Sequence, residues 1–146
     1  MSVERHKETV RRIFEDYVNR GKAEFLAELF AEDYVIVQSG APPAGREAFA
    51  ATIAALREGF PDTRYSIAEM ASDGDVVTVH WQWQGTHRGV FRGPAGVFPA
   101  TGKSISNDGA ATFHVEDGKV TRGRVISDRL GFLHQIGEPA TAQPTR

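Results

Sequence analysis

The sequence DGKVTRGRVISDRLGFLHQIG, residues 117–137, decides how the rest of the chain is interpreted. Its Asp-Gly pair predicts a tight turn, and KVTRGRVIS predicts a strand over residues 119–127. The strand ends at Asp128, after which LGFLHQIG predicts a short apolar helix that ends at Gly137. An aspartate in this place can be a catalytic carboxylate or a helix N-cap. We favour the cap, which typically stabilises a helix by ~1 kcal/mol.

The register of the hairpin that leads into this strand decides which side chains share a face. A two-residue loop would pair Glu116 with Lys119, and a three-residue loop with a left-handed glycine would pair Val115 with Lys119. We predict the three-residue loop, because it separates apolar from polar side chains, and a slip of one residue would reverse both faces. The predicted inner face then comprises Ala111, Phe113, Val115, Thr121, Gly123 and Val125.

Upstream of this hairpin the chain carries helical patterns first and strand patterns after them. Apolar residues at helical spacing predict three helices, over residues 3–20, 22–31 and 46–59. Alternating or β-branched segments predict strands over residues 34–38, 63–71, 75–87 and 104–116. The segment 85–102 contains five Gly and two Pro, which predicts a long loop or a broken hairpin.

This order of elements predicts an α+β fold in which three N-terminal helices pack on a strongly curved antiparallel sheet with an internal pocket. The length fits a single domain, for which we expect residues 1–138. The tail 139–146 lacks large apolar side chains and is expected to be disordered.

Composition argues against several classes of protein. The 146 residues carry a net charge of −2 with scattered basic residues, so no nucleic-acid or membrane partner is expected. The chain has no cysteine, which removes disulfides, thiolate metal sites and cysteine nucleophiles. No apolar run reaches the length of a membrane span, and no set of His, Asp and Glu has metal-ligand spacing. We expect a cytoplasmic protein with no metal and no other cofactor.

The predicted inner surface is apolar, and this pattern fits a plain core at least as well as a ligand pocket. In the strand 75–87 the alternation places Trp81 and Trp83 on the inner face, where they would be core residues or flat walls for a ligand. If the surface is a pocket, the residues expected to contact the substrate are Tyr34, Ile36, Phe60, Trp81, Trp83, Ala111, Phe113 and Val125.

Polar candidates for chemistry are few, and each has a structural alternative. Tyr17 lies on the apolar stripe of the first helix, and Gln38 would add a hydrogen-bonding group to the pocket floor. His87 lies in the glycine-rich segment, where a pocket mouth could lie, although a mobile loop histidine is the simpler interpretation. Catalysis would be expected from Tyr17, Gln38, His87 and Asp128.

Two further groups of polar residues lie on the predicted strands. Residues 107–109, NDG, could form a β-bulge that aims Asn107 or Asp108 inward. His80 and His114 are expected on the polar outer face of the sheet, at solvent or at a dimer contact.

Eight short segments together resemble the SnoaL-like polyketide cyclases, within the nuclear-transport-factor-like superfamily of cone-shaped α+β domains. They are VRRIFEDYVNRG at 10–21, FAEDYV at 30–35, GREAF at 45–49, FPD at 60–62, GTHRGVF at 85–91, PATGK at 99–103, EDGKV at 116–120 and DRLGFLHQIG at 128–137. The resemblance covers roughly residues 8–138 and implies the cone-shaped barrel, an internal pocket and a homodimer. It is less specific for the reaction, because this superfamily hosts many functions.

The resemblance also predicts where the acid/base group of an aldol cyclase would be, and the chain departs from it there. The family's aspartate falls at Val125, its histidine at Ala111 and its amide at Gly109, and its asparagine falls at Ile36. The tyrosine that some members place on the first helix is matched by Tyr17. A valine cannot shuttle protons, a role that is typically worth ~10²–10⁴-fold in rate.

The sequence therefore predicts a cyclase of SnoaL-like type that acts on a hydrophobic polyketide-like small molecule, in the lyase or isomerase class. Ring closure would depend on the shape of the pocket and on proximity, as in a pericyclic or conjugate reaction. One alternative is a non-catalytic module for binding a hydrophobic ligand or for dimerisation. The other is a dehydratase, isomerase or epoxide hydrolase on the same fold, which would need Asp108, Asp128 or His87 inside the cavity.

Overall fold

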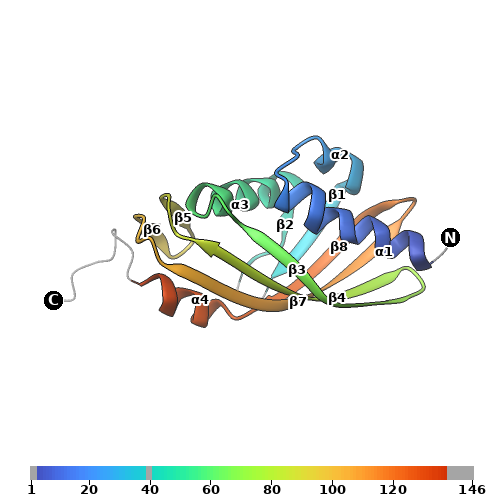
Figure 1. Cartoon of the computed structure of the whole chain (residues 1–146). Helices are drawn as coiled ribbons and strands as arrows, with labels where there is room; N and C mark the ends of the chain where they lie inside the picture. The colour runs from blue at the N-terminus through green and yellow to red at the C-terminus, as the bar shows by residue number, and fades with distance from the viewer. Residues whose placement is uncertain (1–2, 39–40, 138–146) are drawn as a thin grey trace.

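The computed structural model describes residues 3–38 and 41–137, so the predicted disordered tail, 139–146, lies outside the described residues. Three helices and a π-helical turn lie along one face of a six-stranded sheet, as the α+β prediction requires (Figure 1). The elements are α1 (Val3–Arg12), η1 (Ile13–Asn19), α2 (Phe25–Leu29), β1 (Phe30–Gln38), β2 (Ala44–Gly45), α3 (Arg46–Gly59), β3 (Arg64–Asp73), β4 (Val76–Thr86), β5 (Phe91–Gly93), β6 (Gly96–Phe98), β7 (Ser104–Glu116), β8 (Lys119–Ser127) and α4 (Arg129–Ile136).

The sheet has the strand order β2-β1-β8-β7-β4-β3. The pairs β3–β4, β4–β7 and β7–β8 are antiparallel, as predicted, whereas β1 runs parallel to β8. A parallel pair cannot be read from the pattern of either strand alone, because both bury one face in either orientation. The segment expected to be a long loop or broken hairpin contains the short hairpin β5–β6, which lies beside α3 (Figure 1).

The turn of the last hairpin differs from the prediction. Asp117 and Gly118 have φ values of 52° and 78°, so they form a two-residue loop of type I′ that pairs Glu116 with Lys119. The predicted three-residue loop is therefore wrong. Beyond the turn the apolar face is nevertheless as predicted, because a β-bulge leaves Thr121 unpaired and shifts the register by one residue. Next to the turn the prediction is wrong, since Val120 and not Thr121 pairs with Val115 and is buried. Phe113 then pairs with Gly123, and Ala111 with Val125.

The bulge considered as a possibility at residues 107–109 does not occur, since the β4–β7 ladder continues without a break from Val76 to Thr86. Gly109 has a different reason to be a glycine. A Cβ atom at Gly109 would overlap the carbonyl oxygen of Ile126 and lie 2.6 Å from the Trp81 ring. The glycine allows close packing of two strands and an indole, not an irregular backbone.

The first helix, predicted as one unit over 3–20, changes type at Ile13. The turn η1 is a π-helix whose Ile13, Phe14, Tyr17 and Val18 are buried. The spacing of these apolar residues suits either type of helix, so the sequence pattern could not distinguish them. π-helical turns occur frequently at functional sites, and this one covers the inner face of the sheet.

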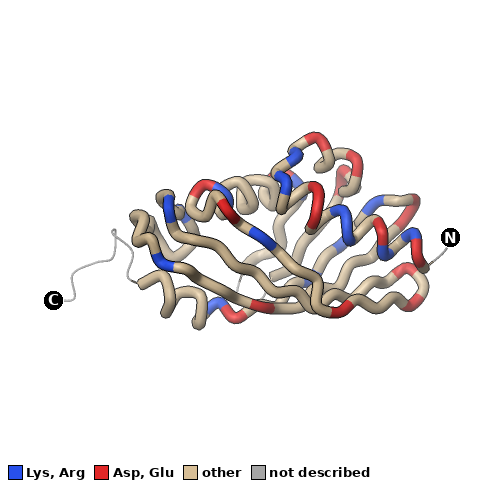
Figure 2. The backbone as a smooth tube through the Cα atoms, viewed as in Figure 1, with Lys and Arg blue, Asp and Glu red and all other residues tan. Residues whose placement is uncertain are grey.

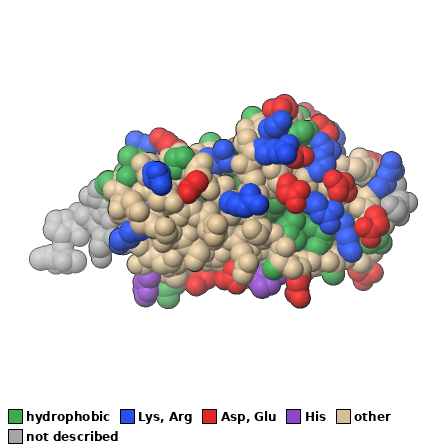
Figure 3. All heavy atoms as spheres, in the orientation of Figure 1, with side chains coloured by type: hydrophobic (Ala, Val, Ile, Leu, Met, Phe, Trp, Pro, Cys, Tyr) green, Lys and Arg blue, Asp and Glu red, His purple; other side chains and the backbone are tan. Residues whose placement is uncertain are grey.

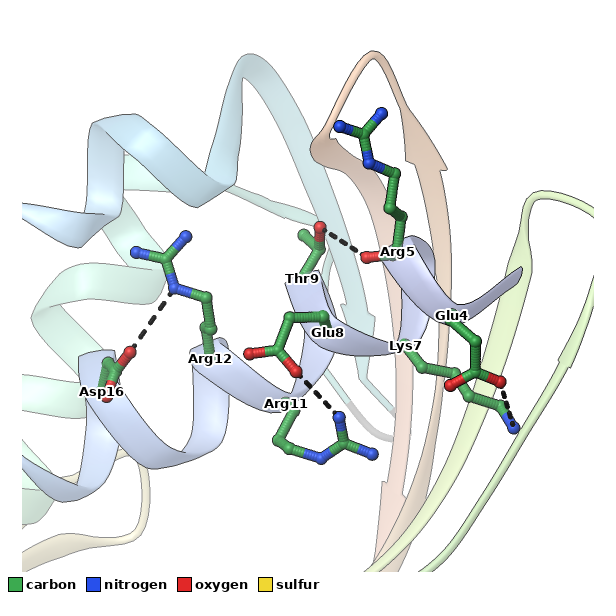
Figure 4. A network of polar contacts seen from close by, with 8 residues as sticks. All are labelled: Glu4, Arg5, Lys7, Glu8, Thr9, Arg11, Arg12 and Asp16. Carbon is green, nitrogen blue, oxygen red and sulfur yellow. Dashed lines mark hydrogen bonds and ion pairs between the residues drawn. The ribbon is translucent and has the colours of Figure 1, made fainter. Parts of the chain in front are cut away.

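The solvent-facing side of α1 carries charges of both signs three or four residues apart (Figure 4). Three ion pairs run along it: Glu4–Lys7, Glu8–Arg11 and Arg12–Asp16. Figure 2 shows acidic and basic residues gathered along α1 and α2, and Figure 3 shows both signs mixed on this face. Pairs at a protein surface contribute ~0–1 kcal/mol each, and these three, of which Arg12–Asp16 is half-buried, form part of a solvated surface. None of the described helices is long and apolar enough to cross a membrane.

Candidate functional site

A cavity of about 250 Å³ lies between the helices and the inner face of the sheet. This volume is close to the lower end of the range for small-molecule pockets, which begins at ~300 Å³. The helical wall comprises Ile13, Phe14, Val18, Phe49, Ile53 and Leu56. At one end the tip of the β5–β6 hairpin, residues 93–95, and α4 line the cavity, and the exposed Pro94 and Ala95 mark where it meets the surface.

Strand pairing sorts the sheet side of the cavity into rows. One row runs from Phe113 through Gly123 to Ile36, and the next runs from Ala111 through Val125 to Gln38. These rows are apolar except for Gln38, at the end of β1. A third row, nearer to α4, runs from Trp81 through Gly109 to Ser127.

The next row is different, because it crosses three strands with hydrogen-bonding side chains. Tyr65 on β3 pairs with Trp83 on β4, and Trp83 pairs with Asn107 on β7. All three line the cavity. The indole nitrogen of Trp83 is buried and has no hydrogen-bond partner among the described residues. Thr52 and Arg129 are further polar residues in the lining.

Tyr65 is held in place by its neighbours. Its ring packs on Phe14 and on Trp81, with centroid distances of 5.5 Å and 5.1 Å. The Asn19 side chain donates to the Tyr65 carbonyl oxygen at 2.8 Å and accepts from the Tyr65 N–H at 2.7 Å. Burial raises the pKa of the Tyr65 phenol, so the hydroxyl stays protonated and can donate a hydrogen bond near neutral pH.

Seven of the residues proposed from the sequence line the cavity. They are Ile36, Gln38, Trp81, Trp83, Ala111, Phe113 and Val125. Val125, Ala111 and Ile36 are three of the positions at which the resemblance places acid/base or polar groups. Their apolar side chains therefore face the cavity where an aldol cyclase would present its chemistry.

Three aromatic residues proposed from the sequence lie outside this lining, in the surrounding core. Tyr17 packs on Phe30 and Phe49, and burial, followed by the nearby Glu47 carboxylate, raises its pKa. The Tyr34 ring also packs on Phe30 and Phe49. Phe60 is fully buried against Trp83 and His87.

His87 is a core residue, neither at a pocket mouth nor in a mobile loop. Its side chain is fully buried and stacks on Phe60 with the ring centroids 5.0 Å apart. One ring nitrogen lies 3.0 Å from the Thr101 hydroxyl, and the other lies 3.1 Å from the Phe98 carbonyl oxygen. Because a carbonyl oxygen only accepts, Nε2 carries a hydrogen. Both nitrogens therefore tie the segment after β4 to the strand β6 and the residues that follow it.

Asp128 is the N-cap of α4, as predicted. Its carboxylate accepts a hydrogen bond from the Gly131 N–H at 2.9 Å. It faces a separate polar groove whose other walls are Ser66, Gln82, Trp83, Gln84, Ser106, Asn107 and Asp108. Asp108, His80 and His114 are exposed, and Asp108 lies 3.4 Å from the His80 ring. Of the two residues considered at the expected bulge, Asn107 lines the main cavity by ordinary strand alternation.

Tyr65 was missed by sequence reasoning. The alternation of Tyr65 and Ile67 in RYSIAEM is the signal that could have identified it, but a β-bulge between Ile67 and Glu69 obscures the pattern. The cavity lining, within the part of the chain that the structure describes, contains no carboxylate and no histidine. Residues 3–38 and 41–137 also hold no cluster of His, Asp and Glu that could bind a metal ion.

Comparison with known proteins gives a family for this fold. A proposed SnoaL-like polyketide cyclase from Jannaschia sp. CCS1 is 26% identical, with a TM-score of 0.79 over 97% of this chain and 94% of that one. IdmH, a proposed polyketide cyclase from Streptomyces antibioticus, is 28% identical, with a TM-score of 0.77 over 90% and 98% of the two chains. AclR, a proposed hydroxylase from Streptomyces galilaeus, is 18% identical with a TM-score of 0.82, and at that identity it shares the fold alone.

A search of curated proteins gave no match. The family model of the SnoaL-like polyketide cyclases matches residues 8–136, which is most of the sequence and includes every wall of the cavity described above. The chain belongs to the SnoaL-like polyketide cyclase family.

Proposed function

We propose that the protein closes a ring in a hydrophobic, polyketide-like small molecule held in the cavity between α3, η1 and the sheet. The observation that carries this proposal is the lining: aromatic and aliphatic side chains surround the cavity, and they include Ile36, Ala111 and Val125, where the resemblance implies polar or acid/base groups. Family membership supports a cyclase-type role, and the apolar lining suggests a reaction without a proton shuttle. Such an activity falls in the lyase or isomerase class.

The physical basis is that ring closure can be promoted by holding two ends of one molecule together. Well-oriented intramolecular reactions gain up to ~7–11 kcal/mol from proximity, without any proton transfer by the protein. A pericyclic or conjugate closure fits this better than an aldol reaction. An aldol reaction needs a base for a C–H bond, and the lining, in the described part of the chain, has no carboxylate or histidine to supply it.

The test is to incubate the purified protein with the linear precursor made by the enzymes encoded beside its gene, and to look for the cyclic product. Wild type is expected to accelerate ring closure, and the substitution Val125→Asp is expected to give no further acceleration. If Val125→Asp forms product and wild type does not, the natural protein is not a cyclase.

The same absence of acid/base groups supports one alternative, a module that binds a hydrophobic ligand without changing it. Tight binding with complete recovery of the unaltered linear molecule would favour that function. The third possibility, a dehydratase, isomerase or epoxide hydrolase, gains no support from the geometry. Its candidate groups Asp108, Asp128 and His87 all lie outside the cavity lining.

We further propose that the outer face of the sheet pairs two copies of the chain. That face carries the exposed side chains of His80, Gln82, His114 and Arg124, together with Ile126, which is 61% exposed. Leu130, at the start of α4, is 66% exposed. Sedimentation equilibrium is expected to give the mass of a dimer for wild type and of a monomer for Ile126→Lys. A monomeric wild type would exclude this pairing.

A further inference from the structure

The polar row of the cavity, defined as Tyr65, Trp83 and Asn107, is the feature from which a ligand property can be inferred. Neighbouring strands lie ~4.8 Å apart, so the Cα atoms of Tyr65 and Asn107 are separated by about two strand spacings, with Trp83 between them. Their side chains project from the same face of the sheet into one cavity. A single small molecule in that cavity can therefore contact both.

The Tyr65 hydroxyl makes no hydrogen bond within residues 3–38 and 41–137, although its ring is wedged between Phe14 and Trp81. Its position is fixed by the backbone as well as by packing. The strand β3 is at the edge of the sheet, and the Asn19 amide bonds both the N–H and the carbonyl of Tyr65, as a neighbouring strand would. A rigid, protonated and unpaired phenol in an apolar cavity is a prepared hydrogen-bond donor.

Asn107 is held in a comparable way on the other side of Trp83. Its Oδ1 accepts a hydrogen bond from the Asp108 N–H at 3.0 Å, which leaves its amide hydrogens as donors. The preceding residue, Ser106, is bonded by the Gln135 side chain of α4 at both its N–H, at 3.0 Å, and its carbonyl, at 2.8 Å. Side-chain amides from two different helical segments thus hold the backbone at each end of the polar row.

We propose that the Tyr65 hydroxyl, with the Asn107 amide as a second donor, binds a carbonyl oxygen of the ligand. The ligand class is then an apolar molecule with a carbonyl group, oriented so that its oxygen faces the polar row and its hydrocarbon lies over Ala111, Phe113 and Val125. This inference rests on the proposed function, since it assigns a role within the same cavity.

In ring closure the hydrogen bonds would do more than orient the substrate. They draw electron density from the carbonyl and from any double bond conjugated to it, which makes the conjugated carbon a better acceptor for the closing bond. They also stabilise the negative charge that develops on the oxygen in the transition state. In a pericyclic closure the new bonds form from the π electrons of the substrate, so no proton is transferred. In a conjugate closure the proton lost by the attacking group goes to solvent, and solvent returns a proton to the carbon beside the carbonyl.

The test uses two small probes that differ only at one position, 1-indanone and indane, which share a bicyclic skeleton and differ by the carbonyl oxygen. Binding of each is measured by NMR titration to wild type and to Tyr65→Phe. The variant is expected to lose about fivefold in affinity for 1-indanone, the value for one ordinary hydrogen bond, and to bind indane as wild type does. The matched control Tyr34→Phe removes a hydroxyl that does not line the cavity and should change neither affinity.

A second readout needs no variant. The infrared carbonyl stretch of 1-indanone is expected to shift to lower frequency on binding to wild type, and to shift less on binding to Asn107→Leu or Tyr65→Phe. An unshifted stretch in wild type, or equal losses of both probes in Tyr65→Phe, would overturn the assignment of Tyr65 as a donor and leave the proposed cyclase standing. If wild type binds neither probe, this inference is overturned together with the use of the cavity as a small-molecule site.

Discussion

The hydroxyl of Tyr34 is buried opposite Gly123, and this pair gives a quantitative test of how the core beside the cavity is packed. The Tyr34 oxygen has no hydrogen-bond partner among the described residues. A Cβ atom at Gly123 would lie 2.6 Å from it, which is closer than such atoms can approach. The perturbations are Tyr34→Phe, Gly123→Ala and the double variant.

The magnitudes follow from these two observations. An unpaired buried hydroxyl costs ~1–3 kcal/mol, so Tyr34→Phe is expected to raise the free energy of unfolding. This gain is reduced slightly, because the variant loses the few packing contacts of the oxygen, each worth ~0.1–0.2 kcal/mol. Gly123→Ala alone forces the oxygen aside and is expected to cost ~1–3 kcal/mol. With the oxygen removed, the nearest atoms to the new methyl group are ring carbons of Phe113 at 3.4 Å. The double variant should therefore be more stable than wild type. Alanine in place of glycine adds ~0.4–1 kcal/mol to this, because it lowers the conformational entropy of the unfolded chain.

The assay is urea unfolding followed by the fluorescence of Trp81 and Trp83, with the four proteins forming a double-mutant cycle. The expected coupling energy is ~1–3 kcal/mol. Gly45→Ala is the matched control, because the nearest atom to its new methyl group is 3.8 Å away and no clash arises. Destabilisation of the protein by more than ~1 kcal/mol in Tyr34→Phe would show that the hydroxyl is hydrogen-bonded and not an unpaired group. Additive effects of the two substitutions would refute the proposed clash.

Three further predictions concern ligand binding in the cavity, the N-cap of α4 and the loss of stability at low pH. Ala111→Phe should fill the cavity and abolish 1-indanone binding in an NMR titration, whereas Ala110→Phe, on the exposed face, should not; equal binding by both variants would place the ligand elsewhere. Asp128→Ala should lower the free energy of unfolding by ~0.5–2 kcal/mol through loss of the cap and leave 1-indanone affinity unchanged, and lost affinity would show that Asp128 contacts the ligand. Hydrogen bonds from the backbone N–H and the hydroxyl of Thr86 lower the pKa of Asp62, so its stabilisation is present above the pKa of the unfolded chain and is lost as pH falls through the folded value. In Asp62→Asn the melting temperature should fall less steeply than in wild type as the pH is lowered from about 5 to about 2. An unchanged slope of melting temperature against pH would contradict this role.

The fold could be predicted from the sequence largely because burial is periodic. The alternation around Trp81 and Trp83 and the helical stripe at Val10, Ile13 and Phe14 indicate the buried faces directly. The faces of the last hairpin beyond its bulge were also predicted correctly, although its turn was not. Asp-Gly accommodates both loop types, and the bulge at Thr121 that reconciles the short loop with the apolar face has no signal of its own.

The candidate site was less predictable, because a side chain's distance from a cavity is set by packing between elements. Tyr17 and Tyr34 lie on faces as apolar as those of Ile36 and Trp81, yet both pack on Phe30 and Phe49 and neither lines the cavity. His87 looked like a loop residue because its segment is rich in glycine. Its ring bonds to Phe98 and Thr101, which lie 11 and 14 residues further along the chain and are brought next to it by the hairpin β5–β6.

The rate of ring closure of the linear precursor as a function of pH, compared between wild type, Val125→Asp and a sample without protein, decides whether the cavity closes the ring without acid/base groups. We predict acceleration by wild type that stays constant between about pH 6 and pH 9. No carboxylate or histidine occurs among the described lining residues, and burial raises the pKa of Tyr65, which keeps its phenol protonated over that interval. A bell-shaped profile, or acceleration by Val125→Asp alone, would contradict it.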